Sequence, residues 1–204
     1  MIIYYTPAFS SAKGESRRLL TEAISEYTGD RGRAGALSAG IRTGEKGKPY
    51  IDGFDFFSVS HTEKVWAVLF CERECGLDIQ LRRNCRETSI AEKFYHPDDA
   101  AAVAAARDED PQKGSDVFFR LWARREALVK AAGGSVADSG IPPVMKDRAS
   151  YGGIKYSIKD IMIPEIPELF AAVCVRGDGV PGPEILRLEK QIQFQDGYRK
   201  EKQK

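Results

Sequence analysis

The sequence lacks the features that mark membrane proteins and general nucleic-acid binders. In its 204 residues no apolar run approaches the roughly 20 residues that a helix needs to cross a bilayer. Lys and Arg total 31 against 30 Asp and Glu, so the formal net charge is only +1. This balance gives no general attraction to nucleic acid or to an anionic membrane surface. An affinity for phosphate groups must therefore come from a local cluster of side chains.

Cysteine and histidine are scarce as well, with four and two residues. The cysteines are isolated in sequence, which fits a reducing compartment, and the apolar start lacks the charged leader of a signal peptide. We therefore predict a cytoplasmic location. Cys71, Cys75, Cys85 and His96 are an alternative zinc set, but their spacing lacks a paired ligand knuckle. The remaining cysteine and histidine are Cys174 and His61.

The residues that are present indicate a globular α+β protein, with 42% hydrophobic and 30% charged residues. Residues 31–48 are expected to form a loop with one short strand, the strands between 56 and 81 an antiparallel meander, and residues 198–204 a frayed tail. The order of predicted elements, which is strand, helix, strands, helices and strands, predicts antiparallel sheets packed on helices. Predicted strands cover residues 1–6, 56–60, 65–70, 76–81, 154–163, 169–175 and 185–188, and predicted helices cover 11–27, 89–95, 97–107 and 116–132.

An acidic residue interrupts the predicted strand over residues 76–81. The two-residue period of a strand places the aliphatic side chains on one face and Gly76, Asp78 and Gln80 on the other. Asp is disfavoured inside strands, and a hard metal ion with oxygen ligands is one reason for its presence. A surface strand with its polar face in water explains the same pattern.

A second acidic residue lies on the predicted helix over 116–132. Trp122, Glu126 and Lys130 are spaced by four residues and share one stripe, which Phe118 extends. A carboxylate among large aromatic side chains requires a metal, a cation or a proton. Glu126 is therefore a candidate metal ligand or base, although an ordinary Glu–Lys pair on a helix remains the alternative.

Two short polar segments are candidate phosphate-binding sites. Ser60, His61 and Thr62 follow one another at the end of a predicted strand, where free backbone N–H groups suit an anion. Upstream, Lys48 is displayed by a rigid turn between Gly47 and Pro49. A plain turn and an ordinary surface histidine are the alternatives.

Taken in order, these motifs resemble the pattern of the surfactin-type (Sfp-type) 4′-phosphopantetheinyl transferases. That family has a G-K/R-P turn, a strand ending in S-H-S/T, then G-x-D-x-E and W-x-x-K-E-A-x-x-K. This chain has G-K-P at 47–49, F-S-V-S-H-T at 57–62, G-L-D-I-Q at 76–80 and W-A-R-R-E-A-L-V-K at 122–130. The match spans about residues 48–130, with a looser echo in the strand at 170–175.

The resemblance implies a fold of two similar α+β halves related by a pseudo-twofold axis, which we place at residues 1–95 and 96–204. The first half carries the phosphate-binding motifs and the first metal ligand, and the second carries the W-x-x-R-E-A-x-x-K helix. Coenzyme A would bind in the cleft between the halves of a monomer. The implied reaction transfers phosphopantetheine from coenzyme A to a serine of an apo carrier protein and releases 3′,5′-ADP.

The resemblance also implies roles for individual residues. The Mg²⁺ ligands would be Asp78 and Glu126, with Gln80 as a third; Asp78, Glu126 and Lys130 would be catalytic. Lys130 would contact the transferred phosphate, and Glu126 would help to deprotonate the serine. The residues expected to bind coenzyme A are Lys48, Ser60, His61, Thr62 and Lys130, with Arg17 or Arg18 as a further contact. Asp99 matches a position that is often acidic in the family, and Arg120, Arg124 and Arg125 are expected to attract an acidic carrier protein.

Departures from the family pattern leave other functions open. Gln80 replaces a glutamate, which predicts a weaker metal site, and Arg125 replaces a lysine. The chain also begins close to its first strand, so we expect a trimmed adenine side. Gln80 is equally compatible with a non-catalytic homologue that binds coenzyme A or a carrier protein. In an unrelated α+β protein, Asp78 and Glu126 would be structural.

Overall fold

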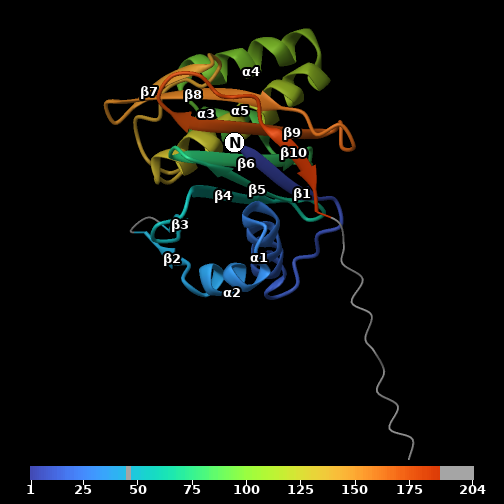
Figure 1. The fold of residues 1–204 in the computed structure, drawn as a ribbon. Helices are drawn as coiled ribbons and strands as arrows, with labels where there is room; N and C mark the ends of the chain where they lie inside the picture. The colour runs from blue at the N-terminus through green and yellow to red at the C-terminus, as the bar shows by residue number, and fades with distance from the viewer. Residues whose placement is uncertain (45–46, 189–204) are drawn as a thin grey trace, which may run out of the picture.

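The computed structural model describes residues 1–44 and 47–188, which form two four-stranded sheets between two layers of helices (Figure 1). The first sheet has the strand order β10-β1-β5-β4, in which β1 is parallel to β10 and antiparallel to β5. A small pair of strands, β2 and β3, lies beside it. The elements of this half are β1 (Ile2–Thr6), α1 (Glu15–Thr28), α2 (Arg31–Ala39), β2 (Arg42–Thr43), β3 (Pro49–Tyr50), β4 (Phe56–His61), β5 (Trp66–Cys71) and β10 (Glu184–Arg187).

The second sheet is entirely antiparallel and has the order β6-β9-β8-β7. The long helix α5 packs mainly on β6 and β9, with α4 beside it. The elements are β6 (Cys75–Leu81), α3 (Glu87–Phe94), α4 (Pro97–Glu109), α5 (Pro111–Ala132), β7 (Arg148–Tyr151), β8 (Ile154–Ile161) and β9 (Leu169–Arg176).

Hydrophobic residues fill three layers because each sheet is buried on both faces. Along β5, Ala67 and Leu69 face the second sheet, whereas Trp66, Val68 and Phe70 face α1 and α2. The far side of the second sheet packs on α3, α4 and α5. The two-residue period of a strand thus supplies side chains to two cores at once. The α+β class with antiparallel sheets packed on helices is confirmed.

The predicted meander is wrong at its third strand. β4 pairs with β5, but β6 leaves that sheet and pairs with β9, about 90 positions later in the chain. The connection over residues 72–74 is short enough for a hairpin within one sheet. Here it carries the chain from the first sheet to the second, which is packed against it.

The loop predicted over residues 31–48 is wrong in its first part, which forms α2. Asp30 caps this helix by accepting a hydrogen bond from the Arg33 nitrogen at 3.0 Å. Two glycines lower its helix propensity and hid it from the sequence pattern. Tertiary contacts compensate: Ala34 is buried, and Thr21 of α1 hydrogen-bonds the Ser38 hydroxyl at 2.6 Å.

Two further differences concern the second half. α5 begins at Pro111 rather than residue 116, because Asp110 both ends α4 and caps α5 through the Gln112 nitrogen. The short edge strand β7 was not predicted. The other predicted strands and helices are confirmed within a few residues, and the tail predicted at 198–204 lies outside the described residues.

The sheets do not divide at one point in the chain. β6 precedes residue 95 but pairs in the second sheet, and β10 is in the later half but pairs with β1 in the first. The division at residue 95 stays a prediction. None of the helices in the described ranges is long and apolar enough to span a membrane.

Candidate functional site

The free edge of β6 runs along β4, and serine hydroxyls satisfy its outward N–H groups. The Leu77 nitrogen donates to Ser58 Oγ at 3.0 Å, and the Ile79 nitrogen donates to Ser60 Oγ at 3.3 Å. Backbone pairing of β6 is to β9. Ser58 and Ser60 are both buried and two residues apart on β4, so they face β6 together. Their hydroxyls join the two sheets.

Lysine ammonium groups satisfy the outward carbonyls of the same edge. Lys48 Nζ donates to the carbonyls of Cys75 and Ala131, each at 3.0 Å, and so joins β6 to the end of α5. Lys130 Nζ donates to the Leu77 carbonyl at 3.2 Å. Burial lowers the pKa of Lys48.

Asp78 is the centre of a compact polar cluster. Its side chain is buried, with the residue 2% exposed. Oδ1 accepts from Lys130 Nζ at 2.6 Å and from the Ser60 hydroxyl at 2.9 Å, and Oδ2 accepts from Gln80 Nε2 at 2.7 Å. The cluster brings together β4, β6 and α5, which are far apart in the sequence.

Glu126 lies half-buried on α5 and interacts electrostatically with Asp78. Burial raises the pKa of the Glu126 carboxyl, and the negative charge of Asp78 raises it further, whereas Lys130 and Arg125 oppose the shift. Within the described part of the chain, Glu126 makes no hydrogen bond or ion pair. A buried carboxylate of β6 and a half-buried carboxylate of α5 thus lie close enough to interact electrostatically.

The carboxylates of Asp78 and Glu126 are oxygen donors of the kind that a divalent metal ion takes. A cation near both groups would relieve their repulsion and the desolvation of Glu126, and oxygen donors suit Mg²⁺. Gln80 adds an amide oxygen, since only its nitrogen is engaged with Asp78. No set of three or more His, Cys, Asp or Glu residues that could hold a metal is found among residues 1–44 and 47–188. The alternative zinc set of Cys71, Cys75, Cys85 and His96 therefore does not assemble.

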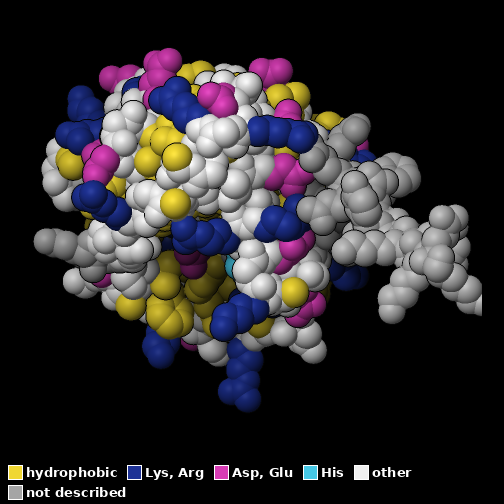
Figure 2. Space-filling model, turned by 60° about the horizontal axis from the view of Figure 1, so that its bottom comes forward, with side chains coloured by type: hydrophobic (Ala, Val, Ile, Leu, Met, Phe, Trp, Pro, Cys, Tyr) yellow, Lys and Arg dark blue, Asp and Glu magenta, His cyan; other side chains and the backbone are white. Residues whose placement is uncertain are grey.

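A hollow of about 460 Å³ lies on the other side of β4 from Asp78. Its lining includes Val59 and His61, which alternate with the two serines along β4, and Arg17 of α1. The His61 ring packs on Phe9 with ring centroids 4.9 Å apart. Figure 2 shows a depression with hydrophobic side chains in its floor and basic side chains around it; no Asp or Glu is among the residues that line the 460 Å³ hollow. A mostly apolar cavity of this size with a few polar groups suits a small organic ligand.

The other predicted coenzyme-binding residues are placed differently. Lys48 lines a second hollow of about 430 Å³, which shares Pro49 with the first. Thr62 Oγ1 accepts from the nitrogens of Lys64 and Val65 at 3.2 and 3.0 Å and so stabilises the β4–β5 turn. Their contacts with a coenzyme stay predictions.

The two candidate arginines of α1 differ in position. The Arg18 guanidinium is exposed and pairs with Glu15 and Glu22, each at 2.9 Å. It is not among the residues that line either hollow. Arg17 lines the first hollow and donates to the Ser38 carbonyl at 2.6 Å. The geometry therefore favours Arg17 over Arg18 as the further contact.

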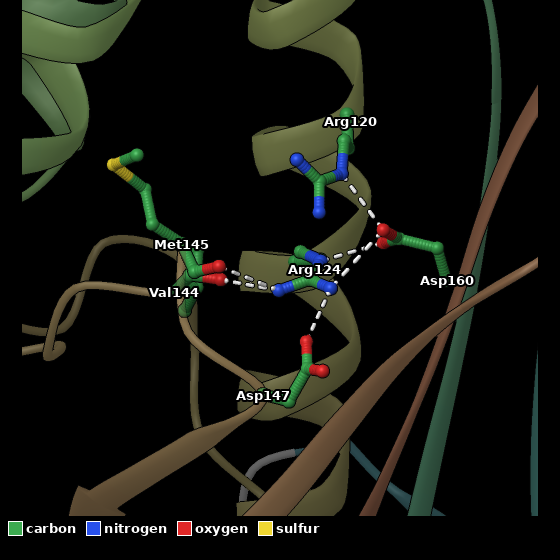
Figure 3. Close-up of polar contacts among 6 residues, drawn as sticks. All are labelled: Arg120, Arg124, Val144, Met145, Asp147 and Asp160. Atoms are coloured by element: carbon green, nitrogen blue, oxygen red, sulfur yellow. Dashed lines mark hydrogen bonds and ion pairs between the residues drawn. The ribbon is translucent and has the colours of Figure 1, made fainter.

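Two of the three arginines expected to attract a carrier protein are buried. Arg124 is 2% exposed and donates to Asp147, Asp160 and the carbonyls of Val144 and Met145 (Figure 3). A charge held inside the protein by four partners is structural, so this part of the prediction is wrong.

Arg125 and Asp99 are buried on the same side of α5. Arg125 is 5% exposed and donates to the Val136 carbonyl at 3.3 Å. It is therefore not a surface attractant either. The Asp99 carboxylate accepts a hydrogen bond from the Val144 nitrogen at 2.9 Å, and burial raises the pKa of this carboxyl. Arg120 is the exposed member of the three arginines and pairs with Asp160 at 2.7 Å.

Comparison with known proteins identifies the class to which this site is similar. Residues 74–146 match the family model of the 4′-phosphopantetheinyl transferase superfamily. This segment contains both carboxylates, Gln80 and Lys130. The comparison therefore supports the superfamily for the part of the chain that carries Asp78, Gln80, Glu126 and Lys130.

Individual relatives agree with the family match. The chain is 34% identical over 113 residues to 4′-phosphopantetheinyl transferase AcpT of Salmonella typhi, an alignment that covers 50% of this chain and 56% of the relative. It is 32% identical over 100 residues to the 4′-phosphopantetheinyl transferase of Bacillus subtilis, covering 47% and 42%. A match to 4′-phosphopantetheinyl transferase HetI of a Nostoc strain is 31% identical over 99 residues, covering 45% and 40%. The chain thus spans about half the length of the curated relatives it matches.

Sequence reasoning missed Ser58 and assigned Ser60 only to phosphate binding. The signal was present: two serines spaced by two residues on a buried strand need hydrogen-bond partners on the same face. The partner strand, β6, was not predicted to lie there, because the meander placed it beside β5.

Proposed function

We propose that this chain transfers the 4′-phosphopantetheine group of coenzyme A to a serine of an apo acyl or peptidyl carrier protein. The observation that carries the proposal is that Asp78 of β6 and Glu126 of α5 interact electrostatically beside Lys130. The hollow that His61 lines is on the opposite face of β4. The family model of this transferase superfamily matches residues 74–146, which hold Asp78, Glu126 and Lys130, and relatives named as such transferases match about half of the chain.

In this reaction the serine oxygen bonds to the β-phosphorus of coenzyme A. The bond from that phosphorus to the bridging oxygen breaks, and 3′,5′-ADP leaves. Glu126 is a suitable acceptor for the serine proton, because burial and Asp78 make its carboxylate more basic than usual. Lys130 brings positive charge to the developing negative charge on phosphate oxygens, exchanging one of its longer hydrogen bonds for the phosphate.

Asp78 and Glu126 would hold Mg²⁺, with the Gln80 amide oxygen as a third donor. The ion, when bound, neutralises charge on the pyrophosphate oxygens. Gln80 instead of a glutamate leaves two carboxylates, so we expect weak affinity for free metal and stronger dependence on the phosphates of the coenzyme.

His61 and Arg17 would bind the phosphate and nucleoside end of coenzyme A in the first hollow. Lys48 would add a phosphate contact, since its ammonium has three N–H donors and two are used within the described residues. One guanidinium nitrogen of Arg17 donates to the Ser38 carbonyl, and the other N–H groups would donate to an anion.

Several finer features belong to the same proposal. Both carboxylates come from one chain, which supports action as a monomer whose two α+β halves are related by a pseudo-twofold axis. The order of motifs supports the surfactin-type subfamily. Free thiols at all four cysteines fit a reducing, cytoplasmic compartment.

The direct test is to incubate the protein with coenzyme A, Mg²⁺ and an apo carrier protein and to weigh the carrier. We expect a mass gain equal to the phosphopantetheine arm, and no gain with Glu126→Gln, which preserves shape but removes the charge. Chelation of the metal should also stop the transfer. Absence of any gain with carrier proteins of fatty-acid, polyketide and peptide-synthetase type would contradict the proposal.

The same experiment separates the second candidate, a non-catalytic module. Gln80 is the observation that favours it, because it removes one negative charge from the metal site. Binding of coenzyme A or the carrier without a mass gain would support the module. Neither binding nor gain would indicate an unrelated protein with structural carboxylates.

A further inference from the structure

A further hollow, of about 460 Å³, lies where the junction of α3 and α4 meets α5 and the segment that follows α5. We call it the α3–α4 hollow. Residues 136–141 line one side of it, and the side chains that matter below are Lys93, Phe94, Tyr95, His96 and Arg125. None of its lining residues lines either of the two hollows beside β4. It is therefore a separate cavity, outside the site assigned to the coenzyme.

Arg125 brings a buried donor without a partner to the α3–α4 hollow. The residue is 5% exposed, and its Nη2 donates to the carbonyl of Val136, which is also a lining residue. The guanidinium therefore lies in the wall of the hollow. Its buried Nε has no hydrogen-bond partner among the described residues. Leaving a buried donor of a charged group unpaired is costly, so this nitrogen requires an acceptor that the protein itself does not provide.

Lys93 and His96 add two more donors from the α3–α4 junction. Lys93 is exposed, and its Nζ lies 5.1 Å from the centroid of the Phe94 ring, which lines the same hollow. His96 caps α4, because its Nδ1 accepts a hydrogen bond from the Asp98 nitrogen at 3.2 Å. A neutral imidazole that accepts at Nδ1 carries its proton on Nε2, which can then donate. Three donor side chains thus meet at one cavity from different elements.

The acidic groups nearby do not cancel this positive charge. Asp138 is the carboxylate in the lining, and its Oδ2 already accepts from a backbone nitrogen at 3.0 Å and from a tyrosine hydroxyl at 3.3 Å. The side chain of Asp98 is 74% exposed, so water and salt screen its charge. Asp99 does not line the hollow. The lining therefore has two permanent cations, Lys93 and Arg125, against one carboxylate, and this balance favours an anion.

We propose that the α3–α4 hollow binds an organic phosphate monoester. Arg125, Lys93 and His96 hold the phosphate, and a compact organic body packs on Phe94 and Tyr95. The planar guanidinium matches two phosphate oxygens at once, and the third oxygen leaves an acceptor for the junction of α3 and α4, which the two oxygens of a carboxylate do not provide. The volume lies within the usual range of small-molecule sites. This binding site does not depend on the proposed transfer reaction.

The two histidines of the chain give each hollow its own NMR signal, since His96 lines the α3–α4 hollow and His61 lines the first. Protein without a histidine tag is titrated with phenyl phosphate, inorganic phosphate and benzoate. The His96 signal is assigned by its loss in His96→Asn, which keeps a residue able to cap α4. We expect phenyl phosphate to move this signal saturably with a Kd of about 1 mM or lower.

The other two probes distinguish the parts of the ligand. Inorganic phosphate should bind about threefold more weakly or worse, because it lacks the apolar body, and benzoate more weakly still, because it lacks the third oxygen. Benzoate that binds as tightly as phenyl phosphate would overturn the assignment to a phosphate. A His96 signal that does not move, while the His61 signal does, would place phosphate in the first hollow and overturn the proposal.

Substitutions then test the two cations of the hollow. Arg125→Met should weaken phenyl phosphate binding by about tenfold or more, and Lys93→Ala by about threefold, because charge-assisted hydrogen bonds are lost. Arg120→Ala and Lys113→Ala are the matched controls. They remove the same residue types from exposed positions outside the hollow, so the Kd should change by less than about twofold.

An unchanged Kd in Arg125→Met would overturn the proposal. Should this buried substitution prevent folding, Arg125→Lys replaces it: the charge stays, the planar fork is lost, and the Kd should rise by about threefold. Lys93 is exposed, so Lys93→Ala tests the same site without disturbing the core. Equal Kd values for Lys93→Ala and Lys113→Ala would also contradict the site. These binding results stand apart from the transfer assay, whose failure would contradict the proposed function alone.

Discussion

Gly76 lies against the backbone of Ala127 so closely that β6 and α5 leave no space for a side chain. A Cβ built on Gly76 overlaps the Ala127 carbonyl oxygen and lies 2.5 Å from the Ala131 nitrogen. These neighbours are backbone atoms of a helix and cannot move independently. The glycine therefore sets the separation between the strand that carries Asp78 and the helix that carries Glu126.

Gly76→Ala should destabilise the protein by about 1–3 kcal/mol or more, the usual cost of overpacking a core. It should also lower transfer activity, because β6 moves away from α5 and the two carboxylates separate. Chemical denaturation measures the first effect. Gly35→Ala is the matched control: Gly35 is in α2, and an added Cβ would meet no atom within 4 Å beyond its chain neighbours and its own helix backbone, so we expect stabilisation of about 0.5–1 kcal/mol. Equal stability of the two variants would contradict this packing argument.

Gln80→Glu should reduce the Mg²⁺ concentration needed for half-maximal turnover. The added carboxylate supplies a third negative donor to the metal but removes the hydrogen bond from Nε2 to Asp78. The metal-free variant should therefore be less stable than wild type, and Mg²⁺ should raise its melting temperature more. Gln80→Ala removes the amide without adding charge and should need more Mg²⁺. An unchanged Mg²⁺ dependence in Gln80→Glu would show that residue 80 does not contact the metal.

Arg124→Met should cost about 1–3 kcal/mol of unfolding free energy, because it leaves the Val144 and Met145 carbonyls without their donor. The loop that contains Val144 and Asp147 loses its attachment to α5 (Figure 3). Arg120→Ala is the control. Arg120 shares Asp160, but its side chain is 47% exposed, and exposed pairs contribute about 0–1 kcal/mol. Similar losses in both variants would contradict a structural role that is special to Arg124.

Cys71 is only 5% exposed, so it should react slowly with an alkylating agent, through a thiolate that forms at unusually low pH. A hydrogen bond from the Cys75 thiol, with a weaker one from the Arg73 nitrogen, lowers the pKa of Cys71 to about 6, although burial opposes the shift. The thiolate is the reactive form, so the rate should rise as pH increases through that value and then level off. Brief labelling of the native protein with peptide mass mapping gives the profile.

Two comparisons check this assignment. Cys75→Ala removes the donor and should move the midpoint for Cys71 upward, toward the usual thiol range. Cys85 is an internal reference, because burial raises its pKa and its labelling should begin only at higher pH. A midpoint that stays near pH 6 in Cys75→Ala would mean that another group stabilises the thiolate.

Most of the local structure was predictable because short-range signals determine it. The helix stop at Gly29, the His96-Pro97 start of α4 and the continuous apolar run of β5 act within a few residues. α2 was missed for the converse reason. Its glycines oppose a helix locally, and packing on α1 compensates for them.

The sequence alone determined which residues are chemically unusual: an aspartate within a strand, a glutamate on an aromatic helix stripe, and a lysine one turn later. It did not determine their partners, because β6 crosses to a second sheet and its free edge depends on residues between 18 and 53 positions away. Each polar side chain forms hydrogen bonds with the groups that the tertiary structure brings close to it, and these groups are distant in the sequence. Only the fold could decide that the Ser60 hydroxyl lies beside Asp78 while His61, its neighbour in the chain, faces an open hollow.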